Sequence, residues 1–581
     1  MGQSAVPASV ASHSPGGLKV LGTVSDGAYE TVLQGCHVTD SGADTPAHAR
    51  LESAKKLADK LKEMANTPLE VPRLLAIWRI LVGSLNEALS YDVCIIPPSL
   101  MAPLANQLDD IVSELLALIA GTGWSQTQDD LCRLDRQCGG CGVPSCTTRA
   151  YTAFLASVLR CPPIHKDAQS VRAGAGLIGH VAESLGWLQQ KGIWIDDWGM
   201  PHKSRPSASM RPESMPAVSL PQRQRAWRTM LAQLEAERLA VKVPLLSSRM
   251  GLEGGAFLTA TPAEVGTTMT DPTFRTSLRF RLDMPVCGRE VCAHRAAGRN
   301  SSGKICGEFM NSNGHHAVLC KLGGGVTPVH DACCGRLYAA ARASGLRALR
   351  EQVIPELREP KRAEPRVDLE TWGIASEPRG LFDFTICAPF ATRYATGAEA
   401  VEAGEARKRN EYPAVGGLHV QGIAADVYGR IGPALTNTLT KWADMARQRD
   451  ISRGLSPKRW LHLWRTQLSV EIATGVSRLI VTADFDTAPS AQHWKPVPPI
   501  GRTGLMVDSS AIVQEKAEAK DSSQNASSTS QPQVCESELC EAAPFAASPA
   551  ALSFDGCAIA ECEEEEEEAA RFLHASPTMP A

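Results

Sequence analysis

The sequence predicts a multidomain chain with a helical N-terminal region, a small metal-binding module, an α/β domain and a disordered acidic C-terminal tail. Three observations lead to this fold class. Amphipathic helical patterns fill much of the first 120 residues. Cysteines and histidines crowd between positions 287 and 334. Two short strand-like segments follow at 366–369 and 381–386, and each carries an aspartate, Asp368 in the first and Asp383 in the second.

Length and composition restrict the class of the protein. A chain of 581 residues that is 43% hydrophobic has room for roughly three or four domains with their own cores. No apolar run approaches the ~20 residues that span a bilayer, and the N-terminus lacks a signal-peptide pattern. We therefore expect a nuclear or cytoplasmic protein with no membrane partner. Without an export signal, its 18 cysteines favour reduced thiols and a metal site over disulfides.

Charge is unevenly distributed along the chain. The net charge is −4, but residues 508–581 hold 15 acidic and 3 basic side chains, so the rest of the chain carries a net +8. A moderately basic body suits a polyanionic partner, although this excess alone is a weak signal. The C-terminal segment is rich in Ser, Ala, Gln and Glu, with six consecutive glutamates at 563–568, which predicts disorder.

The spacing of apolar residues predicts the order of helices and strands. Residues 1–15 are expected to be disordered, and 162–218 irregular, with a Pro-rich linker at 201–218. Helices are predicted at about 45–66, 70–90, 100–120, 147–159, 221–240, 433–448 and 456–474. Strands are predicted at 16–22, 418–427 and 478–481, and a helix is expected to carry Glu405, Lys408 and Tyr412.

Two groups of cysteines could hold a metal ion. Zinc takes four Cys or His ligands in a tetrahedron, with a short loop between the members of a pair. In the richer group we expect Cys292, Cys306, His316 and Cys320, with Cys287 and His315 as the alternates. The other group is Cys132, Cys138, Cys141 and Cys146, which has one Cys-x-x-Cys but no histidine, so a glycine turn lined with thiols is favoured there.

The two aspartates are candidates for a second, different kind of metal site. Restriction-type nucleases hold Mg²⁺ with two carboxylates on adjacent strands and use a lysine beside the scissile phosphate. Asp368 and Asp383 fit the carboxylate pair, whereas Thr385 occupies the usual lysine position, two residues after the second acid. We expect Lys408 to replace that lysine from the next helix, one turn from Tyr412. An upstream acid, Glu356, is a further candidate.

Basic residues near these acids suggest contacts with nucleic-acid phosphates. The candidates are Arg393, Arg407 and Arg409. His330 is expected to begin the helix after the cysteine group, where it packs or touches phosphate.

Several separate motifs then follow one another in a fixed order. They are GGLKVLG at 16–22, GGCGV at 139–143, GAFL at 255–258, FRTSL at 274–278, Cys306-Gly307, GHHAVLC at 314–320, Gly323-Gly324, His330-Asp331, FDFTI at 382–386, PFATRY at 389–394, and Lys408 with Tyr412. In this order they resemble the C-terminal part of the polyprotein of site-specific non-LTR retrotransposons. Departures include Pro328-Val329 in place of a basic pair, Val367 in place of Pro, and Cys141 in place of Leu.

The resemblance implies a domain order and a function. It implies the end of a reverse transcriptase palm and a helical thumb at 16–160, a linker and helix at 161–250, and a pre-knuckle segment with a zinc knuckle at 251–335. A restriction-enzyme-like PD-(D/E)XK endonuclease would then occupy 336–485, and the tail 486–581. The acids of the palm would lie before residue 16, so no polymerase activity is expected from this chain alone. The expected activity is Mg²⁺-dependent nicking of target DNA, with the retrotransposon RNA as a second partner; the alternative is a non-catalytic nucleic-acid-binding remnant.

Overall fold

The computed structural model describes residues 46–484 with short gaps. The gaps are 68–71, 161–174, 196–200, 204–219, 244, 252–253, 263–265, 296–303, 323–324, 359–363, 374–378, 392–393, 395, 413–416 and 450–453. All described residues belong to the first of two units of the chain, residues 1–497 and 498–581. The predicted strand at 16–22, most of the linker at 201–218, Arg393 and the acidic tail therefore lie outside the described residues.

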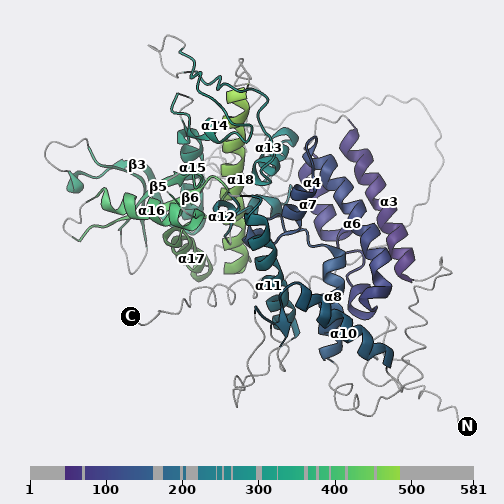
Figure 1. The fold of residues 1–581 in the computed structure, drawn as a ribbon. Coiled ribbons are helices and arrows are strands. Elements are labelled where there is room, and N and C mark those ends of the chain that lie inside the picture. The colour runs from purple at the N-terminus through teal and green to yellow at the C-terminus, as the bar shows by residue number, and fades with distance from the viewer. Residues whose placement is uncertain are drawn as a thin grey trace, which may run out of the picture. The chain divides into compact units, whose positions relative to one another are not determined.

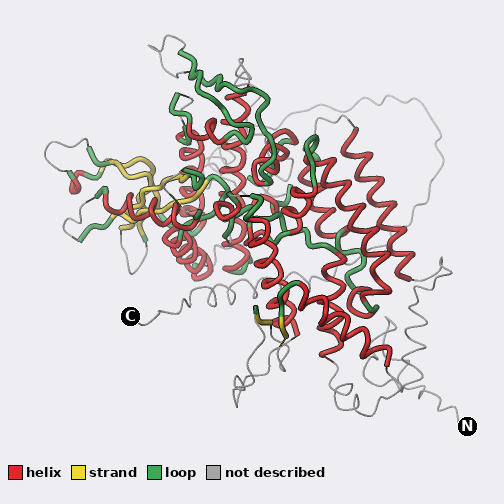
Figure 2. Tube along the Cα trace, viewed as in Figure 1, coloured by secondary structure: helices red, strands yellow, loops and turns green. Residues whose placement is uncertain are grey.

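Helices dominate the first part of the described chain (Figures 1 and 2). They are α3 (Pro46–Asn66), α4 (Leu74–Ile80), the π-helical turn η1 (Leu81–Leu85), α5 (Asp92–Ile95), α6 (Pro98–Ala120), α7 (Gln126–Arg133), η2 (Arg136–Cys138), α8 (Cys146–Arg160), α10 (Ala175–Gln190), α11 (Leu220–Ala240), α12 (Leu246–Arg249), η3 (Ala256–Thr259) and α13 (Asp271–Arg281). A short antiparallel pair, β1 (Trp194–Ile195) and β2 (Pro201–His202), follows α10. The described helices include none that is long and apolar enough to cross a membrane.

Most of these helices were predicted from their apolar spacing. Helices α3, α6, α8 and α11 confirm the predictions at 45–66, 100–120, 147–159 and 221–240. The predicted helix at 70–90 is instead divided into α4 and the π-helical turn η1. Pro98 begins α6, where proline at the first helical position loses no hydrogen bond.

The prediction of irregular structure throughout 162–218 was wrong, because α10 lies within it. Three glycines in this helix weaken its intrinsic propensity. Tertiary packing compensates: Leu188 is buried with Leu155 and Trp227, and the ring of Trp187 stacks on Tyr151 with centroids 4.5 Å apart. Contacts with α8, and a hydrophobic cluster shared with α8 and α11, therefore stabilise a helix that local sequence does not predict.

The second part of the described chain is built on one four-stranded sheet (Figure 2). Its strands, in order across the sheet, are β3 (Arg347–Val353), β4 (Arg366–Trp372), β5 (Arg379–Cys387) and β6 (Val420–Asp426). The first three are antiparallel, whereas β5 and β6 are parallel and are joined through helix α16 (Gly397–Asn410). A parallel pair requires such a crossover, which carries α16 across β5 and β6.

Helices cover the sheet and connect it to the N-terminal helices (Figure 1). Helix α15 (Thr327–Ala343) contacts β3, β4 and β5, and α17 (Pro433–Gln448) contacts β6. The long helix α18 (Pro457–Asp484) packs on α15, α17 and α13. Two of its residues, Val470 and Ala473, belong to the core that also contains α3, α4 and α6. Helix α18 therefore joins the two parts of the described chain.

A predicted strand at 478–481 was wrong, because these residues form the last turns of α18. The three apolar residues of this segment, Leu479, Ile480 and Val481, cannot by themselves distinguish a strand from a buried helix. The buried positions decide the matter: Val476, Leu479, Ile480 and Ala483 are spaced by three, one and three residues, as on one face of a helix. The predictions at 418–427 and 433–448 are confirmed by β6 and α17.

Gly422 allows α16 to lie directly on β6. A Cβ atom at this position would approach the Glu405 carbonyl oxygen to 2.2 Å and the Arg409 backbone nitrogen to 2.7 Å, both in α16. The buried Glu405 side chain also accepts hydrogen bonds from the backbone nitrogens of Ala434 and Leu435, in the first turn of α17. The sheet, α16 and α17 therefore fix one another closely.

We expect Gly422→Ala to lower the free energy of unfolding by about 1–3 kcal/mol, because helix backbone must move to admit the methyl group. The exposed Gly83 in η1 has nothing within 4 Å of its added Cβ, so Gly83→Ala serves as the control. That control is expected to be neutral or stabilising, by about 0.4–1 kcal/mol. Thermal unfolding followed by circular dichroism measures both; equal melting of the two variants would contradict the tight contact.

Candidate metal centre and active site

Four side chains between residues 292 and 320 gather into one cluster. Ligand atoms of Cys292, Cys306, His316 and Cys320 all lie within 4.8 Å of one another. The Cys306 sulfur is 3.4 Å from His316 Nε2, close to the ~3.6 Å that separates nitrogen and sulfur ligands around a tetrahedral zinc ion. Three thiols and one imidazole can hold a metal ion. This is the set of residues that the sequence predicts.

Two local structures bring the four ligands together. Antiparallel bridges join Val291 to Phe309 and Arg295 to Ile305, so that Cys292 and Cys306 lie on paired segments. The short helix α14 (His315–Leu319) supplies the other two ligands, His316 near its beginning and Cys320 directly after its end. Gly314 precedes α14 with φ of 73°, a left-handed conformation that glycine adopts without strain. Each pair of ligands therefore comes from one local structure.

Electrostatics in the cluster favours a cation. Burial, together with the neighbouring Cys320 and Cys306 thiols, raises the pKa of Cys292 to about 12. Neighbouring thiolates repel one another unless a positive ion lies between them, and metal binding releases their protons. The cluster therefore couples metal binding to deprotonation of its cysteines.

The two alternate ligands have other roles. The His315 ring stacks on Phe390 with centroids 4.3 Å apart, its Nδ1 lies 3.0 Å from the Asn311 side-chain nitrogen, and burial lowers its pKa to about 4. Cys287 is buried near Gly314, and its thiol does not belong to the four-residue cluster. The structure therefore favours His316 and Cys292 over His315 and Cys287.

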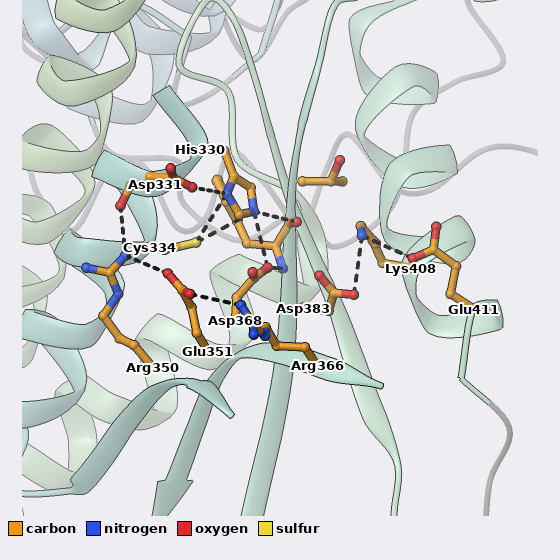
Figure 3. Close-up of polar contacts among 12 residues, drawn as sticks. His330, Asp331, Cys334, Arg350, Glu351, Arg366, Asp368, Asp383, Lys408 and Glu411 are labelled. Atoms are coloured by element: carbon orange, nitrogen blue, oxygen red, sulfur yellow. Dashed lines mark hydrogen bonds and ion pairs between the residues drawn. The ribbon is translucent and has the colours of Figure 1, made fainter. Parts of the chain in front are cut away.

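The second candidate site lies where β4 and β5 separate. Their pairing extends as far as Leu369 and Phe382. At the next position Asp368 would lie opposite Asp383, but Asp368 Oδ2 instead accepts a hydrogen bond of 2.7 Å from the Phe384 backbone nitrogen. The Asp368 side chain thus takes the place of a backbone acceptor on β4, at the point where the two strands separate, which we call the fork. The sequence predicts the carboxylates of Asp368 and Asp383 on adjacent strands, and they face each other at this fork (Figure 3).

Lys408 completes the predicted trio (Figure 3). Its Nζ lies 3.3 Å from Asp383 Oδ2 and 3.0 Å from Glu411 Oε2. Burial and the nearby Asp368 carboxylate raise the pKa of Asp383 to about 7. Burial opposes the charge of Lys408, but the attraction of Asp383 outweighs it and raises the pKa of the lysine. Two crowded carboxylates beside an ammonium group form a site that can accept a divalent cation.

His330 also reaches this site, from the first turn of α15 (Figure 3). Its Nε2 lies 3.2 Å from Asp368 Oδ2 and 3.2 Å from the Phe384 carbonyl oxygen. Burial opposes protonation, but the contacts with Asp368 and Cys334 outweigh it and raise the pKa of His330 to about 11. His330 was predicted to begin the helix after the cysteine cluster; α15 begins three residues earlier, at Thr327, so His330 lies in its first turn. Its contact with Asp368 was not predicted.

Other candidate residues lie around the pair in different ways. Tyr412 was predicted on the helix with Lys408, but α16 ends at Asn410, so this prediction was wrong. Its hydroxyl donates to the Arg366 carbonyl oxygen at 2.8 Å, and burial with Asp383 nearby raises the pKa of this tyrosine. Glu356 lies in the short turn η4 (Pro355–Leu357) and forms an ion pair of 2.8 Å with Arg379 at the start of β5.

The predicted phosphate-binding arginines are only partly described. Arg393 lies outside the described residues. Arg407 donates a hydrogen bond of 2.9 Å to the hydroxyl of Thr385, the residue at the usual lysine position, and Arg409 is exposed one residue after Lys408. The last turn of α16 therefore carries three consecutive basic residues beside the carboxylate pair.

Comparison with known proteins adds no family assignment. The chain matches no model of a known protein family and no curated protein. Its function must be argued from these two sites and from the motifs in the sequence.

One residue of the site was missed from the sequence. Cys334 is buried one helical turn after His330, and its sulfur lies 3.7 Å from His330 Nε2. The signal was available as a His-x-x-x-Cys spacing within a helical pattern, which places both side chains on one face. The approach of this face to Asp368 depends on how α15 packs against β4, which local sequence does not encode.

Proposed function

We propose that the sheet with α16 forms a Mg²⁺-dependent DNA endonuclease and that the Cys292–Cys306–His316–Cys320 cluster holds a structural zinc ion. The observation that supports the nuclease best is the arrangement at the strand fork, with Asp368 and Asp383 on neighbouring strands and the Lys408 ammonium 3.3 Å from Asp383. Three groups from three elements converge there. If the two aspartates and the lysine were ordinary solvent-exposed residues, nothing would require them to lie together.

The donor atoms fit the two ions differently. Carboxylate oxygens suit Mg²⁺. The raised pKa of Asp383 reflects its burial first and then the neighbouring Asp368 carboxylate, whose negative charge a divalent cation would offset. Thiolates and imidazole suit zinc, and a closed set of four protein ligands is typical of structural rather than catalytic zinc sites. We therefore assign Mg²⁺ to Asp368 and Asp383, and zinc to the Cys/His cluster.

Cleavage of a phosphodiester requires water to attack phosphorus while the bond to a sugar oxygen breaks and that oxygen gains a proton. Mg²⁺ supplies a Lewis acid that polarises the phosphate and lowers the pKa of bound water. Asp368 is oriented for this task by its hydrogen bond from the Phe384 backbone nitrogen. Lys408 is positioned to donate hydrogen bonds to the phosphate oxygens, on which negative charge develops.

Basic residues next to the site support a polyanionic substrate. Arg407, Lys408 and Arg409 follow one another in the last turn of α16, beside the two acids. The motif order in the sequence supports the wider proposal that the chain is the C-terminal part of a retrotransposon polyprotein, with thumb-like helices before the knuckle. Under that proposal the partners are the target DNA and the retrotransposon RNA.

The test is a nicking assay on supercoiled plasmid with the full chain. We expect cleavage with Mg²⁺ and none in EDTA, because the carboxylates act through the bound ion. The expected product is the relaxed circle, because one carboxylate pair cleaves one strand at a time. DNA binding is measured on the same preparation by gel shift in buffer without added Mg²⁺, because EDTA would also remove the structural zinc ion. A chain that binds DNA but does not nick it with Mg²⁺ or Mn²⁺ would replace this proposal with that of a non-catalytic nucleic-acid-binding protein.

A further inference from the structure

A second group of metal-binding side chains lies beside the carboxylate pair. It consists of His330, Cys334 and Asp368, whose ligand atoms all lie within 4.8 Å of one another. We propose that these three residues form a separate site for a zinc-class transition-metal ion and that this site shares Asp368 with the nuclease centre. The binding site itself stands on its own geometry, whereas its effect on cleavage rests on the proposed function.

The distances between donor atoms fit tetrahedral coordination. With zinc bonds of about 2.0–2.1 Å to nitrogen, 2.3 Å to sulfur and 2.0–2.2 Å to oxygen, tetrahedral angles place nitrogen ~3.4 Å from oxygen and ~3.6 Å from sulfur. In the structure His330 Nε2 lies 3.2 Å from Asp368 Oδ2 and 3.7 Å from Cys334 Sγ. Both nitrogen distances therefore fit one ion. The third pair, Cys334 Sγ and Asp368 Oδ2, lies within 4.8 Å and would reach ~3.6 Å on binding.

Asp331 supplies an independent indication of a metal ligand. Its Oδ1 lies 3.1 Å from His330 Nδ1, the ring nitrogen that faces away from Asp368. Metal-binding histidines usually donate the hydrogen of their other ring nitrogen to a carboxylate or carbonyl oxygen, which leaves the first nitrogen free to bind the ion. Asp331 can hold His330 in this form, with Nε2 directed at Asp368 (Figure 3).

The donor set also decides which ion the site takes. A thiolate and an imidazole favour Zn²⁺ or Co²⁺ over Mg²⁺, which prefers oxygen ligands. Cys334 is buried, and its position one helical turn from His330 places both donors on the same face of α15. Three protein ligands leave a fourth position open, unlike the closed cluster of four at Cys292. On binding, Cys334 loses its thiol proton to solvent. His330 loses the proton on Nε2 to solvent as well, and with it the contacts of Nε2 with Asp368 and Phe384.

Sharing Asp368 makes the two ions compete. The oxygen that would bind the transition metal, Asp368 Oδ2, belongs to a carboxylate that the nuclease needs for Mg²⁺. An ion held by His330 and Cys334 would draw that carboxylate toward α15. Zinc would therefore inhibit Mg²⁺-dependent cleavage through a site that Mg²⁺ itself does not fill.

Titration of the metal-free full chain with Co²⁺ tests the binding site directly. Thiolate-bound Co²⁺ absorbs in the near ultraviolet and visible range, so each site can be counted without any activity measurement. We expect about two ions per wild-type chain and about one in Cys334→Ala, because only the four-ligand cluster remains. Cys333→Ala is the matched control: this neighbouring thiol is fully buried but does not belong to the three-residue group, so about two ions are expected.

Asp331→Asn provides a second variant, at an exposed residue whose change does not threaten folding. We expect it to weaken Co²⁺ binding at the second site by about 10–100-fold. If Cys334→Ala binds as much Co²⁺ as wild type, or if the wild type binds only one ion, the site does not exist. If Asp331→Asn binds Co²⁺ as tightly as wild type, the role assigned to Asp331 is wrong and the site loses its independent support.

The effect on cleavage is measured separately, as the ratio of nicking with and without Zn²⁺ at constant Mg²⁺. In the wild type this ratio should fall as Zn²⁺ fills the second site, and Cys333→Ala should behave in the same way. Cys334→Ala should require about tenfold more Zn²⁺ or higher for the same fall. If the chain binds two Co²⁺ ions but never nicks DNA, the proposed nuclease is wrong and the metal site stands. If nicking by the wild type, Cys333→Ala and Cys334→Ala is equally sensitive to Zn²⁺, the two ions do not compete for Asp368.

Discussion

Asp383→Asn should reduce Mg²⁺-dependent nicking by about 10²–10³, and Lys408→Ala by a similar factor. These factors correspond to about 3–4 kcal/mol of transition-state stabilisation by preorganised charge. Asp383 is nearly buried between Asp368 and Lys408, so removing its charge takes away one of two metal ligands and the partner of the lysine. Initial rates of plasmid nicking at saturating Mg²⁺ measure the loss.

DNA binding should be almost unchanged in both variants. Affinity for DNA comes mainly from many phosphate contacts, so the loss of one charge has a small effect. Arg409→Ala is the matched control for Lys408→Ala: it removes a positive charge from the next residue of the same helix, but its side chain is exposed. Equal nicking by wild type and Lys408→Ala would show that Lys408 is not the displaced lysine of the site, and a loss of activity in Arg409→Ala as large as in Lys408→Ala would assign the effect to general charge.

Cys320→Ser is expected to remove the metal ion from the Cys292–Cys306–His316–Cys320 cluster. We expect elemental analysis of zinc-saturated protein to show about one zinc fewer per chain in this variant than in the wild type, because a structural site needs all four ligands. Binding free energy in small metal modules is largely folding free energy, at about 10–16 kcal/mol for structural zinc in peptides. The segment between residues 287 and 320 should therefore lose its structure.

The damage should remain local. The core of α3, α6 and α8 contains no residue of the Cys/His cluster, so it should keep its structure. Hydrogen exchange read by mass spectrometry can separate the two regions, with rapid exchange expected at 287–320 and protection retained in α6. Cys287→Ser is the control, since it removes a buried thiol nearby that is not a ligand. A wild-type protein without zinc, or a Cys320→Ser variant that binds as much zinc as the wild type, would disprove the assignment.

The sequence by itself determined the elements whose signals are local. Apolar spacing predicts helices such as α3, α6 and α17, because burial of one face repeats every three to four residues. The ligand set Cys292, Cys306, His316 and Cys320 was also predicted, since each pair of ligands belongs to one short turn or ribbon. The adjacency of Asp368 and Asp383 followed from two neighbouring strands with an acid in each.

Only the tertiary structure decided the features that depend on contacts between distant segments. The end of α18 was predicted as a strand because its three consecutive apolar residues carry no period, and its burial against α13 and α15 makes it a helix. Helix α10 likewise depends on the packing of Leu188 with Leu155 and Trp227.

The same is true of the metal-binding group in α15. His330 and Cys334 are 38 and 34 residues from Asp368 in sequence, and no local pattern records which face of α15 lies against the fork of β4 and β5. That choice is made by burial of other residues of α15, such as Leu337 and Ala341, in the core shared with the sheet and α18. The sequence shows which residues could bind a metal ion, but the packing of apolar faces away from the site decides which of these residues lie together.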